Sequence, residues 1–354
     1  MSAVSSLTGS VRRWLGLAAL ALAATGAAVP VAAATSSDPA AAGAAGTGAA
    51  GLVRVVASFS ILGDIVQQVG GEDVVVSTLV GPNGDAHGYE PTPSDARKLG
   101  DAQVLVINGL GFETWLPRLQ QASGFSGRLV QASAGVTPRA FEEEHAHGDG
   151  HGHDHGAAID ATGAAQTHSQ GHDHAGHDHG PTDPHAWQSL DNAAIYARNI
   201  GRTLAEVDPA HAAAYEARAQ AYATRILALD ATLKATFAAL PAERRKVVTS
   251  HDAFGYFGDA YGVTFIPVAG LSTSAEPSAG DLVRIIEQVR KEKVAAVFIE
   301  NISSPRLAEQ IVRETGVKIG GTLYSDALSR PGEPAATYLD MFEWNARQLL
   351  EAMR

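Results

Sequence analysis

Short apolar runs alternate with amphipathic stretches along the chain from Leu52 onward. In the first part, the apolar runs are rich in valine, which is typical of buried strands. Nearly continuous apolar strands that alternate with helices favour a parallel sheet covered by helices on both faces. The predicted strands are Leu52–Ser58, Val74–Val80, Val104–Asn108 and Leu129–Ala132, and the predicted helices are Ile61–Val69, Pro93–Leu99 and Thr114–Ala122.

A long helical region precedes a second set of alternating strands and helices. We predict a helix over Asp191–Val207 and a longer one from about Ala210 to Ala239, which Pro241 ends. Such a helix reaches ~45 Å at 1.5 Å per residue, enough to span a domain. Its apolar positions are Leu227, Leu229, Leu233, Phe237 and Leu240. The strands that follow are Lys246–Ser250, Thr264–Val268, Ala295–Glu300 and Lys318–Leu323, and the helices are Ala253–Tyr261, Asp281–Glu292, Pro305–Thr315 and Ala335–Ala352.

The N-terminal segment has the order of a secretory signal peptide. The arginine pair Arg12–Arg13 precedes the apolar run Trp14–Val31, and Ala32–Ala34 supplies small residues for cleavage. The alternative is an uncleaved membrane anchor, but the run is short for a span and contains a proline. We therefore expect residues 1–34 to be removed, residues 35–51 to form a flexible leader, and the protein to act in the periplasm.

The simplest architecture is an α/β protein with two parallel-sheet lobes joined by the long helix. Ligands of open parallel sheets bind beyond the carboxyl ends of the strands, so the expected site is the cleft between the lobes. The predicted parts are the N-terminal lobe (52–207), a His-rich insert within it (142–182), the connecting helix (208–241) and the C-terminal lobe (242–354).

Composition narrows the chemistry. The formal net charge of −12 argues against a nucleic-acid partner and suits a cation as ligand. The chain has no cysteine, which excludes disulfides, cysteine-based zinc sites and an acylated N-terminal cysteine. Any metal site must therefore be built from histidine, aspartate, glutamate or water.

Ten of the 14 histidines lie between His145 and His179, interleaved with aspartate and glycine. Repeated imidazoles indicate contact with a transition metal, but Gly-rich low-complexity sequence does not fix a coordination geometry. We predict weak accessory metal binding there, the alternative being a solvated loop with incidental affinity. The accessory residues are His145, His147, His151, His153, His155, His168, His172, His174, His177 and His179.

Four other residues make a stronger site. His87 follows the second predicted strand, His251 follows the strand that ends at Ser250, and Asp326 follows the last strand, while His185 lies between the insert and a helix. Each alone has an ordinary explanation, such as a surface loop, a helix cap or the end of the histidine run. Together, three imidazoles and one carboxylate satisfy a tetrahedral divalent ion such as Zn²⁺. The remaining histidine, His211, is predicted to be an exposed residue of the long helix.

At these residues the chain resembles the periplasmic solute-binding component of bacterial ABC importers for zinc or manganese. The matching segments are GDAHGYEPTPSDARKL, NGLGFETWL, DPHAWQSLDNA, SHDAFGYFGDAYG and GTLYSDALS. The resemblance implies two lobes joined by a rigid helix and a metal bound in the cleft by His87, His185, His251 and Asp326. It also implies delivery to a membrane permease driven by an ATPase, and we expect a monomer.

Two features favour zinc within this resemblance. Manganese-type members typically have glutamate where this chain has His251, and a His-rich insert is characteristic of zinc-type members. Two departures from the family pattern are the absence of a cysteine pair in the second lobe and the sequence DPHAWQSLDN after His185. The alternatives are a manganese or other divalent-metal binding protein of the same class, and an exported zinc hydrolase. The hydrolase is disfavoured because no His-Glu-x-x-His pair is present.

Overall fold

The computed structural model describes residues 51–140, 182–270, 273 and 278–354. The predicted signal peptide lies outside the described residues. The leader and the His-rich insert also lie outside them, except for the last residue of each, Gly51 and Thr182. Within the described ranges, no helix is both long enough and apolar enough to cross a membrane.

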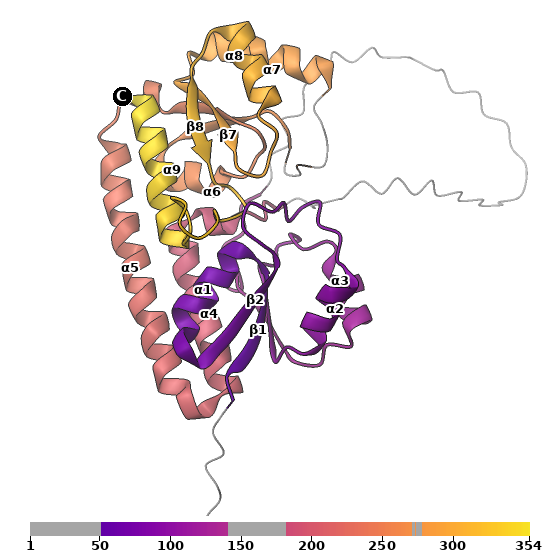
Figure 1. Ribbon diagram of the computed structural model, residues 1–354. Helices are drawn as coiled ribbons and strands as arrows, with labels where there is room; N and C mark the ends of the chain where they lie inside the picture. Colours follow the sequence, from indigo (N-terminus) through magenta and orange to yellow (C-terminus); the bar gives the residue numbers. More distant parts are fainter. Residues whose placement is uncertain (1–50, 141–181, 271–272, 274–277) are drawn as a thin grey trace, which may run out of the picture. The chain divides into compact units, whose positions relative to one another are not determined.

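The first sheet has four parallel strands, as the apolar pattern predicted, and their order is β2-β1-β3-β4 (Figure 1). Nearly every residue of β1 is buried, which explains why the strand is almost continuously apolar. Its strands are β1 (Val53–Phe59), β2 (Val74–Val80), β3 (Val104–Ile107) and β4 (Arg128–Gln131), and its helices are α1 (Ser60–Gly70), α2 (Pro93–Gly100), α3 (Leu116–Ser123) and α4 (Leu190–Val207).

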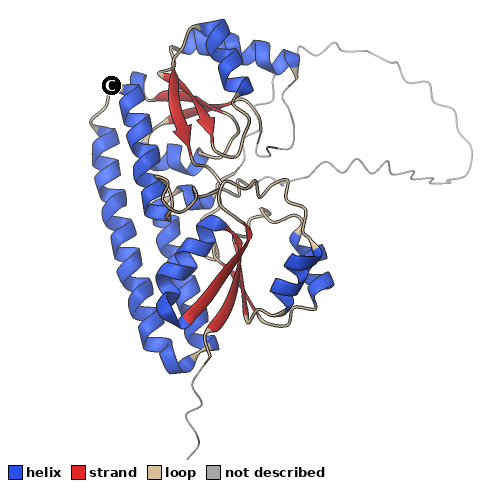
Figure 2. Ribbon diagram, viewed as in Figure 1, coloured by secondary structure: helices blue, strands red, loops and turns tan. Residues whose placement is uncertain are grey.

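The second sheet repeats this arrangement with the order β6-β5-β7-β8, again parallel throughout. Helices flank both sheets (Figure 2). Its strands are β5 (Lys246–Thr249), β6 (Thr264–Pro267), β7 (Ala296–Glu300) and β8 (Ile319–Leu323), and its helices are α6 (Gly255–Tyr261), α7 (Ala279–Glu292), α8 (Arg306–Thr315) and α9 (Tyr338–Met353). Short 3₁₀ turns are η1 (Gly71–Asp73), η2 (Ala186–Gln188), η3 (Pro209–His211) and η4 (Ala242–Arg244).

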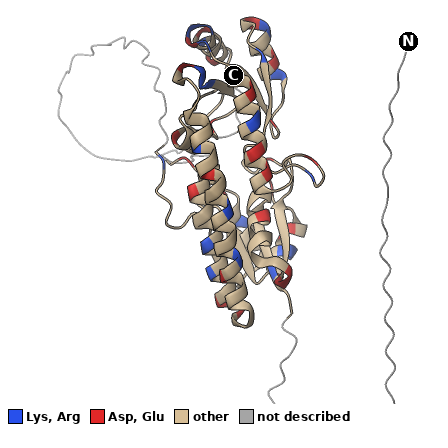
Figure 3. Ribbon diagram, turned by 90° about the vertical axis from the view of Figure 1, so that its left-hand side faces the viewer, with Lys and Arg blue, Asp and Glu red and all other residues tan. Residues whose placement is uncertain are grey.

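The long helix α5 (Ala212–Ala238) packs against α4, α1, α6 and α9. At 27 residues it is about 40 Å long. Of the predicted apolar positions, Leu233 and Phe237 are buried, while Leu227, Leu229 and Leu240 are partly buried and pack against the edge of the core. Tyrosine and alanine complete the buried stripe, which consists of Tyr215, Ala219, Tyr222, Ala223, Ile226, Asp230, Leu233 and Phe237. Lysine and arginine are interspersed with acidic residues along the helices on this side of the molecule (Figure 3).

One hydrophobic core connects the two sheets. Val247, Ala296 and Phe298, on one face of the second sheet, belong to the same buried cluster as the first sheet, α4, α5 and α9. The opposite face, which includes Val248 and Val297, packs with residues of α7 and α8 in a separate cluster. Because the first cluster is continuous, separating the sheets would expose closely packed apolar surface.

Candidate metal centre

The four residues predicted to bind metal come together in the structure. His87 lies in the loop after β2, His185 directly precedes η2, His251 lies two residues beyond β5, and Asp326 lies three residues beyond β8. One potential ligand atom from each lies within 4.8 Å of the others. All four side chains are buried, with at most 4% of any residue exposed. The cluster is therefore enclosed by protein rather than open to solvent.

The spacing within the cluster fits a tetrahedral metal ion. The Nε2 atoms of His87 and His185 lie 3.2 Å apart. The Nε2 atoms of His87 and His251 each lie 3.1 Å from the same Asp326 oxygen, Oδ2. Metal–ligand bonds of about 2.0–2.1 Å at tetrahedral angles place neighbouring ligand atoms about 3.3–3.4 Å apart. These three separations are close to that value, whereas His185 Nε2 lies 3.9 Å from Asp326 Oδ1 and the four ligand atoms lie within 4.8 Å of one another, so a zinc-sized ion would draw the more distant donors inward.

Carboxylates orient two of the three imidazoles. Asp183 Oδ1 lies 2.8 Å from His185 Nδ1 and accepts the backbone N–H of His185 at 3.0 Å. Glu300 Oε2 lies 2.6 Å from His251 Nδ1, and its Oε1 accepts the His251 backbone N–H at 3.0 Å. A carboxylate that accepts the Nδ1 proton leaves the Nε2 lone pair free for a metal. The Asp183 hydrogen bond therefore turns His185 Nε2 toward the cluster, and the Glu300–His251 ion pair holds His251 with its Nε2 at 3.1 Å from Asp326.

Neither of these two carboxylate clamps was predicted from the sequence. In the sequence, Glu300 is only the last residue of a predicted strand, and Asp183 is only the first residue of the segment DPHAWQSLDNA. Both are fully buried. Arg139 also contacts Asp183, at 3.4 Å, and Asp259 of α6, at 3.0 Å, which links this clamp to the second lobe. A buried carboxylate at the end of an apolar strand is the signal that could have identified Glu300.

His87 is held differently from the other two histidines. Its backbone N–H donates to Asp85 Oδ1 at 2.9 Å, and its ring packs against Phe112 in a T-shaped arrangement, with the ring centroids 5.0 Å apart. The preceding carbonyl, of Ala86, accepts a hydrogen bond from Trp115 Nε1 at 3.0 Å. Backbone and aromatic contacts therefore set the position of this imidazole.

Opposite charges perturb the buried groups of the cluster. Burial would lower the pKa of His251, but the charges of Glu300 and Asp326 raise that pKa well above its usual range. Burial would raise the pKa of Asp326, but His251 and His185 hold that pKa well below its usual range. For His87, burial lowers the pKa, although Asp326 opposes this effect. A negative carboxylate surrounded by imidazoles is a suitable environment for a cation.

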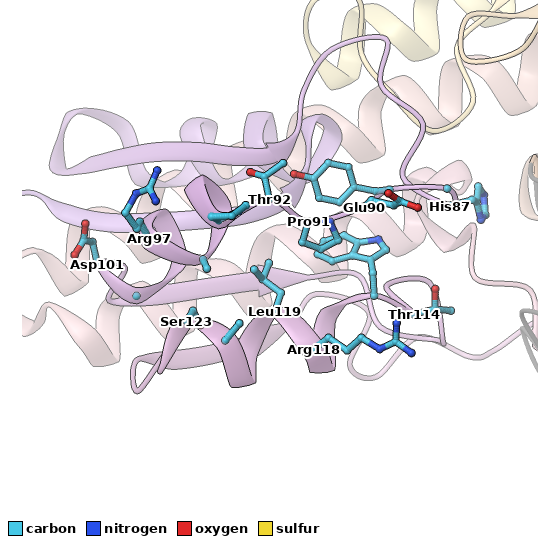
Figure 4. Close-up of a pocket in the computed structure, with 17 residues that line it drawn as sticks. His87, Glu90, Pro91, Thr92, Arg97, Asp101, Thr114, Arg118, Leu119 and Ser123 are labelled. Carbon is cyan, nitrogen blue, oxygen red and sulfur yellow. The ribbon is translucent and has the colours of Figure 1, made fainter. Parts of the chain in front are cut away.

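A cavity of about 1340 Å³ lies beside the cluster, between α2 and α3. Figure 4 shows His87 at one end of the lining residues and Arg97 and Asp101 at the other. His87 is the only member of the cluster that lines it, whereas the other three are enclosed elsewhere. The cavity therefore approaches the candidate metal centre from one side without containing it.

His211 does not belong to the cluster. It ends η3, before α5 begins, so its predicted place within the long helix was wrong. Its Nδ1 lies 2.6 Å from Asp208 Oδ2, and this contact raises the pKa of the imidazole. The side chain is 38% exposed. His211 therefore has a local structural contact at the start of the helix. The ten predicted accessory histidines lie outside the described residues.

Comparisons with known proteins place the chain in a family. The family model described as zinc-uptake complex component A, periplasmic, matches residues 55–352. The chain is 33% identical over 288 residues to the iron-binding protein YfeA of Yersinia pestis, covering 81% of this chain and 82% of the relative. It is 29% identical over 301 residues to the manganese ABC transporter substrate-binding lipoprotein PsaA of Streptococcus pneumoniae, covering 85% and 89%.

A solved structure supports the same conclusion. The periplasmic zinc-binding protein TroA of Treponema pallidum matches with a TM-score of 0.72 and 28% identity, over 86% of this chain and 99% of that protein. These relatives are named for iron, manganese and zinc, so the likeness extends to divalent-metal binding and not to one metal. They are binding proteins, and the chain is likewise not an enzyme. The chain belongs to the zinc-uptake complex component A family, the periplasmic metal-binding components of ABC importers.

Proposed function

We propose that the protein captures Zn²⁺ outside the cytoplasm with His87, His185, His251 and Asp326. The observation that carries this assignment is the third imidazole, His251, whose Nε2 faces the cluster and whose Nδ1 contacts Glu300. Zinc and later first-row ions favour nitrogen donors, whereas manganese accepts oxygen-rich sites more readily. The histidines between positions 145 and 179 support the same metal.

We further propose that the captured ion is delivered to a membrane permease driven by an ATPase. Residues 1–34 would be removed as a signal peptide, which places the mature chain in the periplasm. The buried cluster must open for the ion to leave. Because one core connects the two sheets, small shifts of the loops that carry the ligands fit the packing better than wide separation of the lobes.

Calorimetry with Zn²⁺ and Mn²⁺ tests the choice of metal. On the metal-free chain that begins at residue 35, we expect one tight zinc site and a manganese affinity at least about 100-fold weaker, since three donors are imidazoles. The comparison is best repeated by competition with a chelator, so that both constants lie within the measurable range. Equal affinity for the two ions, or tighter manganese binding, would favour the manganese alternative.

Removing the His-rich insert separates accessory binding from the tight site. Ala140 pairs with Thr182 as an antiparallel bridge, and Asp183 N–H donates to Arg139 O at 2.9 Å. The ends of the insert are therefore adjacent, and a short Asn-Gly turn can join Ala140 to Thr182. We expect this deletion to lower the zinc stoichiometry and to preserve one tight site.

A control for the deletion keeps the length of the insert and replaces its ten histidines with glutamine. Both variants should lose the same weak zinc sites, because imidazole rather than chain length provides the binding. If either variant also lost the tight site, the principal ligands would lie in the insert, contrary to the proposal.

A further inference from the structure

The loop that carries Asp326 is held by the opposite lobe. We call Ser325–Leu328 the Asp326 loop; it follows β8 of the second sheet, and all four of its residues are buried. The carbonyl oxygen of Ser325 accepts two hydrogen bonds, from Trp187 Nε1 at 2.9 Å and from Gln188 Nε2 at 2.6 Å. Both donors lie in η2, directly before α4 of the first lobe.

The far end of the Asp326 loop is held by the same lobe. Leu328 N–H donates to the hydroxyl of Ser60, the first residue of α1, at 3.0 Å. Leu328 O accepts from the backbone N–H of Asn83 at 2.9 Å. Farther along, Tyr338 N–H donates to Asp64 of α1 at 2.9 Å. The chain beyond β8 therefore lies along the first lobe before α9 returns to the second.

Contacts from the second lobe lie mainly just before the loop. Asn345 of α9 accepts from Tyr324 N–H at 2.9 Å and donates to Tyr324 O at 2.8 Å. Within the loop, Asn301 Nδ2 donates to Ala327 O at 3.2 Å. The hydrogen bonds that hold the chain thus come mainly from the second lobe up to Tyr324 and mainly from the first lobe from Ser325 onward.

We propose that Gln188 and Ser60 are positioning residues for Asp326, so that the first lobe positions three of the four ligands. The proposal rests on the ligand set proposed above. Gln188 lies on the turn that begins at His185, and its backbone N–H donates to His185 O at 3.0 Å. One turn therefore carries a ligand and also fixes the loop of another ligand. This coupling sets the separation between His185 and the Asp326 carboxylate.

The amide of Gln188 is suited to this role. Gln188 is fully buried, and among the described residues its side-chain Oε1 accepts no hydrogen bond. The hydrogen bond from Nε2 to Ser325 O is therefore the identified polar contact of the side-chain amide. Without this donor, Ser325 O keeps only the hydrogen bond from Trp187, so the carbonyl is free to turn about its one remaining anchor. A small displacement of Ser325 displaces the neighbouring carboxylate of Asp326, and metal sites are sensitive to such changes in ligand orientation.

The zinc affinity of Gln188→Met, measured by competition with a chromophoric chelator, tests the proposal. The substitution keeps the length of the side chain and removes the donor, and we expect affinity to fall about 10- to 100-fold. Ser60→Ala should act in the same direction at the other end of the loop. In an Asp326→Ala background, Gln188→Met should cause no further loss, whereas in a His251→Ala background its full effect should remain. Thermal unfolding of each metal-free variant accompanies the titrations.

The double-mutant comparison separates positioning from general destabilisation. If Gln188→Met weakened zinc equally in the Asp326→Ala background, Gln188 would not act through Asp326, and the proposal would be wrong. If Gln188→Met does not fold, Ser60→Ala carries the same comparison. If Asp326→Ala alone left affinity unchanged, the ligand assignment itself would fail, which is a different result from the failure of Gln188.

Asn345→Leu is the matched control from the second lobe. It removes two partly buried hydrogen bonds to the Tyr324 backbone beside the Asp326 loop, so it should lower the melting temperature of the metal-free protein. Zinc affinity should stay close to that of the unmodified protein, because the first lobe still holds the loop. A loss as large as that of Gln188→Met would mean that the second lobe positions Asp326.

Discussion

His251→Ala is expected to lower zinc affinity by roughly two to three orders of magnitude. A structural zinc site contributes about 10–16 kcal/mol, so one of four ligands accounts for about 2.5–4 kcal/mol, and each 1.4 kcal/mol is tenfold. His251 is also the ligand held by Glu300 at the end of β7. Competition titrations on the variant that lacks the His-rich insert measure this loss without interference from accessory sites.

The control for this prediction is His211→Ala. It removes an imidazole that lies outside the cluster, so zinc affinity should not change. Unfolding of metal-free His251→Ala must also be measured, because the substitution leaves Glu300 and Asp326 without their shared partner. If His251→Ala folded and still bound zinc as tightly as the unmodified protein, the proposed ligand set would be wrong.

Strand polarity explains why the cluster could be predicted from the sequence. His87, His251 and Asp326 each follow a strand of a parallel sheet, and the carboxyl ends of parallel strands share one edge. The position of β2 was readable from its valine-rich sequence, whereas β5 (KVVT) and β8 (IGGTL) have shorter apolar runs and were placed by the alternation of strands and helices. His185 follows no described strand directly. Its prediction depended on its place between the insert and a helix and on the resemblance of DPHAWQSLDNA to the family.

Contacts made only in the folded chain could not be predicted in the same way. Nothing near His251 in sequence identifies Glu300, which is 49 residues away and meets the imidazole because β5 and β7 are neighbours. The anchorage of Asp326 by Gln188 likewise depends on where the chain passes after β8. The buried side of α5 was partly missed because small alanines and tyrosines face its partners, so leucine positions alone did not define it.

Glu300→Gln is expected to lower zinc affinity by about 100-fold, at the upper end of what a residue behind a metal ligand contributes. Glutamine preserves the shape, and its oxygen can still accept the His251 backbone N–H that Glu300 accepts at 3.0 Å. The amide nitrogen, however, would face His251 Nδ1 and donate to it. The imidazole proton would then move to Nε2, which removes the lone pair that the metal requires. Zinc titration of the metal-free variant measures the loss.

Glu292→Gln is the control, since it makes the same substitution in the same lobe at a partly exposed residue whose carboxylate contacts Lys246. Glu300→Asp is the complementary test, because it keeps a carboxylate acceptor for Nδ1 but shortens the side chain. It should retain more zinc affinity than Glu300→Gln. This order separates the tautomer from packing, because the loss of volume alone would make Glu300→Asp the weaker binder. Unchanged zinc affinity in a folded Glu300→Gln would show that Glu300 does not control which nitrogen of His251 carries the proton. His251 would then either bind the metal without help from Glu300 or not bind it at all.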